Sequence, residues 1–154
     1  MFRTIAQSTV FAAVFAIISS AVAQPQTPAT LSPIGRWLTQ DHDGVIEIAA
    51  CGATLCGRIV GMRKPLGADG TPAHDPAGHP SCGLTILDQV TQPAPGDYRA
   101  QITDPNDGKV WNCVFSLAAD GTLRLRGYVL VRALGRTQTW TRYQGPIGTG
   151  CSLV

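Results

Sequence analysis

The alternation of apolar and polar residues over positions 121–142 constrains the fold of this chain more than any other feature. Both halves of the stretch have a period of two. This period is typical of half-buried strands, because successive side chains point to opposite faces of a sheet. Gly121 and Gly135 stand just before the two halves and indicate turns. The stretch therefore predicts two antiparallel strands of a small β-domain, and it identifies no reaction.

The first 23 residues have the pattern of a signal peptide. Arg3 supplies a positive start, residues 10–18 form an apolar run, and Ala21 and Ala23 give the small-x-small motif that a signal peptidase requires. An uncleaved membrane anchor is the alternative, but the apolar run is too short to span a bilayer comfortably. We expect cleavage after Ala23, a periplasmic or secreted protein, and no transmembrane segment after cleavage.

Cleavage leaves a chain long enough for one domain, since 154 minus 23 residues is 131. Residues 24–33 read as a flexible linker, 34–143 as the folded domain and 144–154 as a Gly-rich tail. Loss of Arg3 lowers the net charge from +2 to +1. So small a net charge provides no field for nucleic acid or acidic lipid, and we expect no nucleic-acid partner.

Short strands separated by turn signals run through the whole domain, and no segment of convincing length has the helical period. The expected strands cover residues 34–39, 45–49, 55–62, 97–103, 109–118, 122–131 and 136–143. Residues 84–90 fit either a short helix or a further strand. A polar loop rich in Pro and Gly, residues 63–83, interrupts the series. About seven or eight strands at hairpin spacing predict an all-β fold, either a barrel or a sandwich.

Export into an oxidising compartment makes disulfide bonds the expected state of the cysteines. The chain has five of them: Cys51, Cys56, Cys82, Cys113 and Cys151. Four residues across a turn separate Cys51 from Cys56, which brings strand positions within bridging distance. We expect these two to pair.

The remaining three cysteines allow several pairings. Cys82 lies in a loop and Cys151 in the tail, whereas Cys113 alternates with Trp111 and Phe115 on an apolar face. This favours a Cys82–Cys151 bond and a buried Cys113 thiol. The other two combinations, in which Cys113 pairs with one of its partners, stay open.

Three segments together carry a resemblance to a known family. They are Gly-Arg-Trp at 35–37, the run from Cys51 to Val60, and Gly127-Tyr128 with the strand 135–142. The combination resembles the bacterial secreted family catalogued as domain of unknown function 2147 (DUF2147), over about residues 33–143. This resemblance implies a lipocalin-like, up-and-down antiparallel β-barrel whose physiological role is unknown.

The Gly-x-Trp motif ending at Trp37 is similar to the opening strand of lipocalins. In that family a tryptophan plugs one end of the barrel and an arginine from a late strand lies on its face, in a cation–π contact. The resemblance implies that Trp37 and Arg142 form this seal, with Arg136 as the second choice for the arginine. Otherwise Trp37 is ordinary core and Arg142 is a solvated strand end.

A barrel with one apolar face must turn that face inward, where it fills the interior or surrounds a ligand. The candidates to line or flank a cavity are Trp111, Phe115, Leu123, Leu125 and Tyr128. The loop 63–83 is a candidate cover for the open end. The expected ligand is a small apolar or amphipathic molecule.

Few residues suggest chemistry. His74, His79 and Cys82 have types that bind zinc or copper, but three ligands on one loop are a loose signal, and a solvated loop is the simpler interpretation. No Gly-x-Ser-x-Gly motif is present. We therefore assign no catalytic residue, metal or cofactor and lean against an enzyme. The leading hypothesis is a ligand-binding envelope protein. The first alternative is a filled barrel with a structural or interaction role, and the second is a metal-binding or enzymatic protein that uses loop 63–83.

Overall fold

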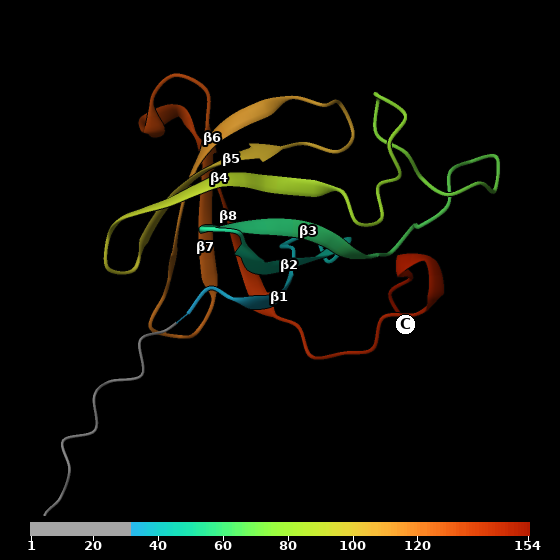
Figure 1. Cartoon of the computed structure of the whole chain (residues 1–154), viewed down its shortest axis with the longest axis horizontal. Helices are drawn as coiled ribbons and strands as arrows, with labels where there is room; N and C mark the ends of the chain where they lie inside the picture. The colour runs from blue at the N-terminus through green and yellow to red at the C-terminus, as the bar shows by residue number, and fades with distance from the viewer. Residues whose placement is uncertain (1–31) are drawn as a thin grey trace, which may run out of the picture.

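The computed structural model describes residues 32–154, so the expected signal peptide and most of the expected linker lie outside the described range. Its strands are β1 (Gly35–Leu38), β2 (Gly44–Cys51), β3 (Thr54–Met62), β4 (Thr85–Ala94), β5 (Asp97–Thr103), β6 (Val110–Leu117), β7 (Leu123–Tyr128) and β8 (Arg136–Arg142). Each strand pairs antiparallel with its neighbour in sequence, and β1 pairs with β8 to close the barrel (Figure 1). The expected all-β, up-and-down barrel is confirmed.

Helical structure within the described residues is limited to two single 3-10 turns, η1 (Arg132–Leu134) and η2 (Thr149–Cys151). In the part of the chain from 32 to 154, no helix combines the length and apolar character needed to cross a bilayer.

The segment that sequence left between helix and strand forms β4. Its pairing with β5 is interrupted by register shifts on either side of Thr91, and Gln89 takes a positive φ of 52°. Ile86 and Leu87 are consecutive and both buried, so the strand lacks a clean alternation. Irregularities of this kind conceal the period of two from a sequence reading, although backbone pairing on both sides still holds the segment extended.

Strand β7 is shorter than expected. It ends at Tyr128, and residues 129–131 leave the sheet and lead into η1. The guanidinium of Arg126 donates to the carbonyl oxygens of Arg132 and Ala133, at 2.7 and 3.0 Å, and so fixes the chain in a tight loop. A side chain that captures backbone oxygens in this way competes with continued strand pairing.

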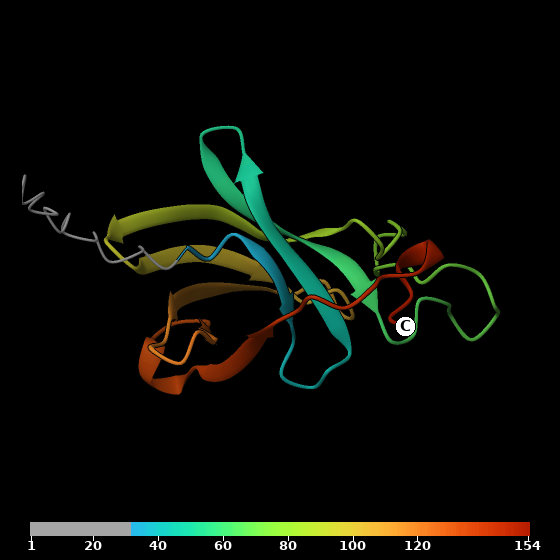
Figure 2. The same cartoon turned by 90° about the horizontal axis from the view of Figure 1, so that it is seen from below.

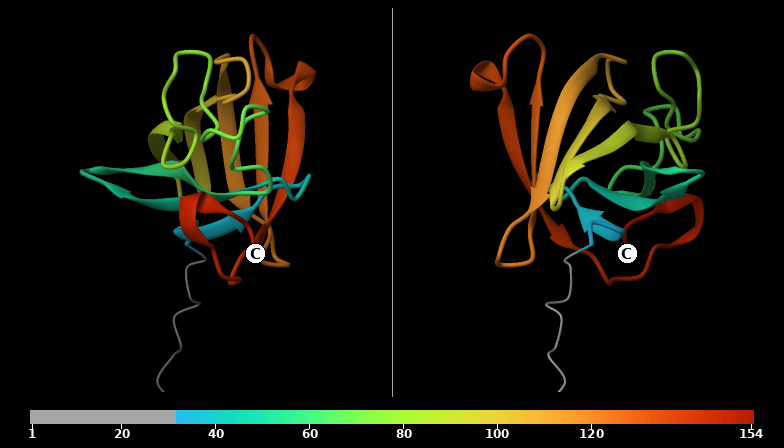
Figure 3. Two further views of the ribbon diagram at one scale, coloured as in Figure 1. Left: turned by 90° about the vertical axis from the view of Figure 1, so that its right-hand side faces the viewer. Right: turned by 60° about the vertical axis from the view of Figure 1, so that its left-hand side comes forward.

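The two ends of the barrel differ. The connections β1–β2, β3–β4, β5–β6 and β7–β8 lie at one end, here called the mouth; the β5–β6 and β7–β8 connections are at the top of Figure 3, right. The connections β2–β3, β4–β5 and β6–β7 lie at the other, here called the closed end, where the chain also enters β1. Packing is dense towards the closed end: Leu123 is completely buried, and the Phe115 and Tyr98 rings stack with centroids 4.9 Å apart.

Two disulfides reinforce the barrel. One joins Cys51 and Cys56 on the β2–β3 hairpin, and the other joins Cys82, at the end of loop 63–83, to Cys151 in the tail. Cys113 is free and buried. The tail is not a loose extension: it runs from β8 to the end of β3 (Figure 2), where the amide of Leu153 donates to the Met62 carbonyl oxygen at 3.0 Å.

Candidate functional site

An open cavity of about 1090 Å³ lies at the mouth, between side chains from β2 to β8. Its apolar wall consists of Ile46, Ile59, Met62, Ile86, Ile102, Trp111, Leu125 and Trp140. Polar and charged groups line it as well, among them Asp41, Asp43, Arg63, Lys64, His74, Asp104, Asn106, Arg136 and Gln138. Many of these come from the mouth loops, so the site has an apolar interior and a charged rim, a combination suited to an amphipathic molecule.

Strand β8 shows how the cavity changes from an apolar interior to a charged rim. Arg136, Gln138 and Trp140 pair with Gly127, Leu125 and Leu123 of β7, so all three occupy the interior face, with Arg136 nearest the mouth. The Trp140 indole N–H donates to Oε1 of Gln138 at 2.8 Å. This bond satisfies the polar atom of the indole, which leaves its rings free for apolar contact.

Arg136 has room around it. The residue opposite is Gly127, where an added Cβ would meet only atoms at about van der Waals distance, the nearest on Trp111 at 3.9 Å. The described residues contain three ion pairs, and Arg136 takes part in none of them. It is a cation on the cavity side of the mouth that pairs with no carboxylate of residues 32–154.

The structure divides the five expected cavity residues into three groups. Trp111 and Leu125 line the cavity. Phe115 and Leu123 lie in the packed core below it, at 3% and 0% exposure. Tyr128 requires a correction, because it pairs with Asn112 on the outer face of the barrel and its ring lies 6.0 Å from the Arg132 guanidinium carbon. It is an odd number of residues from Leu125, and a period of two places such residues on opposite faces.

Sequence reasoning missed Trp140 and Gln138 as lining residues, and it considered Arg136 only for the seal. The alternation within 136–142 contains the signal. Trp140 is the bulkiest apolar residue of that strand, and its face also carries positions 138 and 136.

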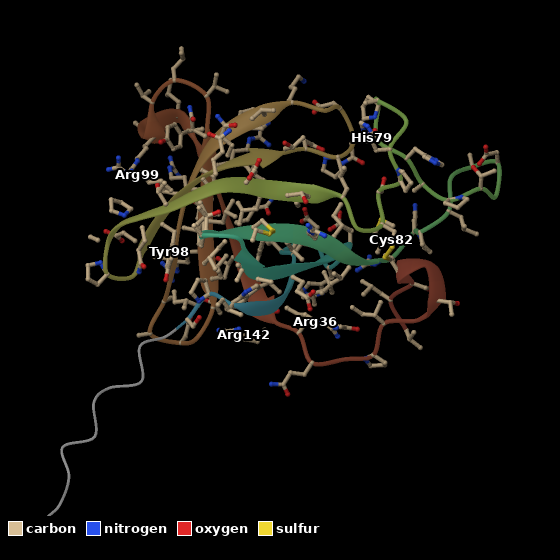
Figure 4. The ribbon with its side chains drawn as sticks, in the orientation of Figure 1. Arg36, His79, Cys82, Tyr98, Arg99 and Arg142 are labelled. Atoms are coloured by element: carbon tan, nitrogen blue, oxygen red, sulfur yellow. A yellow bond between two sulfur atoms is a disulfide. The ribbon has the colours of Figure 1, made fainter. Side chains whose placement is uncertain are left out.

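The closed end carries the seal that the resemblance implied. Trp37 is fully buried, and its indole N–H donates to the carbonyl oxygen of Pro33 at 2.7 Å. The Arg142 guanidinium carbon lies 4.0 Å from the Trp37 ring centroid, and the group also donates to the carbonyl oxygens of Ser32 and Ile34 (Figure 4). Arg136, the second choice, lies at the opposite end of the barrel.

Loop 63–83 folds on itself, and two isolated bridges, Leu66 to Pro72 and His74 to Pro80, divide it into small hairpins. The backbone amide of His79 donates to the carboxylate of Asp75, and this bond holds the Asp75 pKa below its usual value. The hydrogen bond between the His79 ring and the same carboxylate lowers that pKa further, by a smaller amount. Five residues of this loop reach the cavity lining: Arg63, Lys64, Ala73, His74 and Ser81.

The structure does not gather the three candidate metal ligands of this loop. Cys82 is bonded to Cys151 and so offers no thiolate, and His79 lies apart from it on the loop (Figure 4). Across residues 32–154, no group of three or more His, Cys, Asp or Glu side chains is placed to hold a metal ion.

Comparison with known proteins gives a fold and a family. No curated protein matches the sequence. Among solved structures, the chain is similar to protein HP1028 from the human pathogen Helicobacter pylori, which belongs to the lipocalin family. The TM-score is 0.60 at 18% identity, over 75% of this chain and 85% of that one. At this identity the likeness shows the shared fold alone. A sequence model of one protein family matches residues 35–142. The family is described as an uncharacterized protein conserved in bacteria (DUF2147), and the chain belongs to it.

Proposed function

We propose that this protein is an exported carrier or sensor of a small amphipathic molecule, which it holds in the open cavity with the apolar part inward. The observation that carries the proposal is the cavity itself, whose volume of about 1090 Å³ is slightly above the usual range of about 300–1,000 Å³ for small-molecule sites. Trp111 and Trp140 supply large apolar surfaces on its wall. Burial of a ligand chain against them would be favourable in proportion to the apolar area removed from water.

The rim supports a ligand with an anionic head. Arg136 faces the cavity from the interior side of β8 and takes part in none of the ion pairs of residues 32–154, and Gln138 is the next interior residue below it. A planar guanidinium matches a carboxylate or phosphate in a two-point contact. The ligand would therefore lie with its head at Arg136 and its chain towards Leu125.

Two features support export. The N-terminal 23 residues have the composition of a signal peptide. The two disulfides are stable in an oxidising compartment and rare in a reducing one.

The alternatives have less support. A filled barrel would leave no room at the mouth, whereas a cavity of about 1090 Å³ opens there above the core residues Phe115 and Leu123. A metal-dependent role for loop 63–83 loses its only thiolate to the bond with Cys151.

Displacement of a fluorescent fatty acid from the mature protein tests the proposal. We expect saturable binding, and Gly127→Leu should weaken it, because a larger side chain there narrows the cavity beside Trp111 without backbone strain. Thr141→Leu is the matched control, since this exposed residue lies on the outer face of β8. No saturable binding across a panel of lipids would favour the filled-barrel alternative.

The head group can be tested separately. Arg136→Gln should weaken binding of a fatty acid by roughly five-fold, the upper value for an exposed ion pair. It should leave a fatty alcohol of equal chain length unaffected. Equal losses for both ligands would mean that Arg136 shapes the cavity and does not bind the head.

A further inference from the structure

The β7–β8 loop presents an unusual group of exposed apolar side chains. Val129, Leu130, Val131 and Leu134 are 57%, 86%, 51% and 83% exposed. Val110, at the start of the neighbouring strand β6, is 55% exposed. The loop stands at the mouth of the barrel (Figure 3, right, upper left). Single exposed apolar residues are common on soluble proteins, but a contiguous group marks an interaction surface.

The loop is held in this shape from its polar side. Besides its bonds to the two loop carbonyl oxygens, Arg126 donates from Nη1 to the hydroxyl oxygen of Thr137 at 2.8 Å. The amides of Leu134 and Gly135 close turns onto Val131 and Arg132. These bonds secure the backbone, while the apolar side chains point away from the barrel and take no part in its core.

Positive charge surrounds this apolar tip. Between Gly121 and Val154 the chain has five arginines and no aspartate or glutamate, and of the five only Arg142 belongs to the seal at the closed end. A groove of about 250 Å³ on the outer face is lined by Arg99, Arg124, Arg126 and Arg132, and Asp97 is its one acidic lining residue. None of these arginines takes part in the ion pairs of residues 32–154. The small net charge of the whole chain conceals this local excess.

We propose that the β7–β8 loop docks the mouth of the barrel onto an anionic phospholipid surface. The apolar tip enters the interface between headgroups and acyl chains, and the arginines of the groove and of η1 contact the phosphates. A bilayer interface is soft and accepts a protruding apolar tip with a cationic border, whereas a folded protein partner must supply a matching pocket. Because the loop belongs to the mouth, docking would bring the cavity entrance to the membrane.

Vesicle flotation with the mature protein tests the docking. We expect binding to vesicles of phosphatidylglycerol and phosphatidylcholine, and little binding to phosphatidylcholine alone. Half-molar salt should release the protein, because about 1 kcal/mol per arginine near the surface is lost when the charges are screened. Leu130→Asp with Leu134→Asp should lower the partition coefficient at least about ten-fold, since both apolar contacts are replaced by like charges. Arg132→Glu should lower it at least about five-fold.

Ile34→Asp is the matched control, because Ile34 is 49% exposed and lies at the closed end. It should bind vesicles as the unmodified protein does. No binding to anionic vesicles, or equal binding by the control and the double variant, would overturn the proposal. It would also be overturned if the unmodified protein were a dimer and the only effect of the Leu130→Asp and Leu134→Asp changes were to make it a monomer, because the loop would then be a contact between two copies of this chain.

This inference goes beyond the proposed ligand, and the two can fail independently. Fatty-acid displacement in the absence of vesicles should be the same for the double variant and the unmodified protein, because neither leucine lines the cavity. Vesicle flotation should be unchanged by Gly127→Leu, which narrows the cavity and leaves the loop surface as it is.

Discussion

At the scale of single residues, the closed end depends on a few contacts of high quality. Trp37 is completely buried and hydrogen-bonded, and Arg142 covers its face while binding two backbone carbonyl oxygens. Gly35 takes a φ of 132°, and a Cβ there would overlap the Arg142 guanidinium. The motif Gly-x-Trp is thus required as a unit, because the glycine makes the space that the arginine occupies.

Replacing Trp37 with alanine should destabilise the protein by about 3–5 kcal/mol, the usual cost of truncating a buried aromatic side chain. Thermal unfolding followed by circular dichroism measures this as a lower melting temperature. Trp111→Ala is the comparison, since Trp111 is half-buried on an open cavity and should cost less. An equal or smaller effect at Trp37 would contradict a sealing role.

Cys113 is buried in the core, and loss of solvent raises the pKa of its thiol to about 12. The thiolate is the reactive form, so we expect no alkylation of Cys113 in the native protein at neutral pH and complete alkylation after unfolding in denaturant. Mass spectrometry of the alkylated protein distinguishes the two states. Labelling of Cys113 in the native protein would show that the core opens locally.

The same shift predicts how stability depends on pH. The unfolded thiol loses its proton near pH 9, while the folded one keeps it to about pH 12. Between these values the unfolded state binds fewer protons, so the free energy of unfolding should fall as pH rises. Denaturant titrations at a series of pH values give the free energy of unfolding of the unmodified protein and of Cys113→Ala. Plotted against pH, the two free energies should differ in slope over this interval by up to about 1.4 kcal/mol per pH unit. If the two free energies changed in parallel with pH, the raised pKa of Cys113 would be contradicted.

At the scale of elements, the tail and loop 63–83 act as one unit on the side of β3. Their link is the Cys82–Cys151 bond, and Leu153 adds a contact at Gly61, where a Cβ would overlap the leucine side chain. The bond spans 69 positions, against 5 for Cys51–Cys56. In the chain-entropy model a long closed loop stabilises more, about 4 against about 2 kcal/mol.

Cys151→Ala should therefore free Cys82, which is exposed, and make it reactive to a thiol reagent in the native protein. The melting temperature should also fall, and by more than in a variant that replaces both Cys51 and Cys56 with alanine. Peptide mapping of the labelled protein identifies the reactive cysteine. If Cys113 reacts in place of Cys82, the pairing is wrong.

At the scale of the whole molecule, one closed sheet unites every strand. Because β1 pairs with β8, no strand of the barrel is free to separate without breaking pairing on both sides. Such a closure favours cooperative unfolding. Charge is unevenly distributed over the same molecule, since the chain from β7 onward has five arginines and no acidic residue, whereas the rim of the mouth carries Asp41, Asp43 and Asp104.

We expect a single unfolding transition in denaturant with both disulfides intact. Tryptophan fluorescence reports on both ends of the barrel, through Trp37 at the closed end and through Trp111 and Trp140 at the cavity. Far-ultraviolet circular dichroism reports on the sheet, and the two midpoints should coincide. Separate midpoints would show that the mouth unfolds before the closed end.

The sequence by itself determined the all-β class, the approximate strand positions and the family, because period, turn residues and short motifs are local properties. It also led to the two disulfides, from location and spacing. It placed Trp111 and Leu125 on an inward face for the same reason, since alternation within one strand needs no knowledge of its neighbours.

Only the tertiary structure decided where the inward face is solid and where it is hollow. Phe115 and Leu123 share a face with the cavity residues but lie deeper, and depth depends on how the other strands close around them. The end of β7 was likewise set by a side-chain contact that the alternation does not reveal, because Arg126, within β7, holds the loop that follows the strand. The arginine groove exists because β5 and β7 both lie against β6, which brings Arg99 near Arg124 and Arg126. The residues of this groove lie far apart in the chain, and no local pattern encodes their meeting.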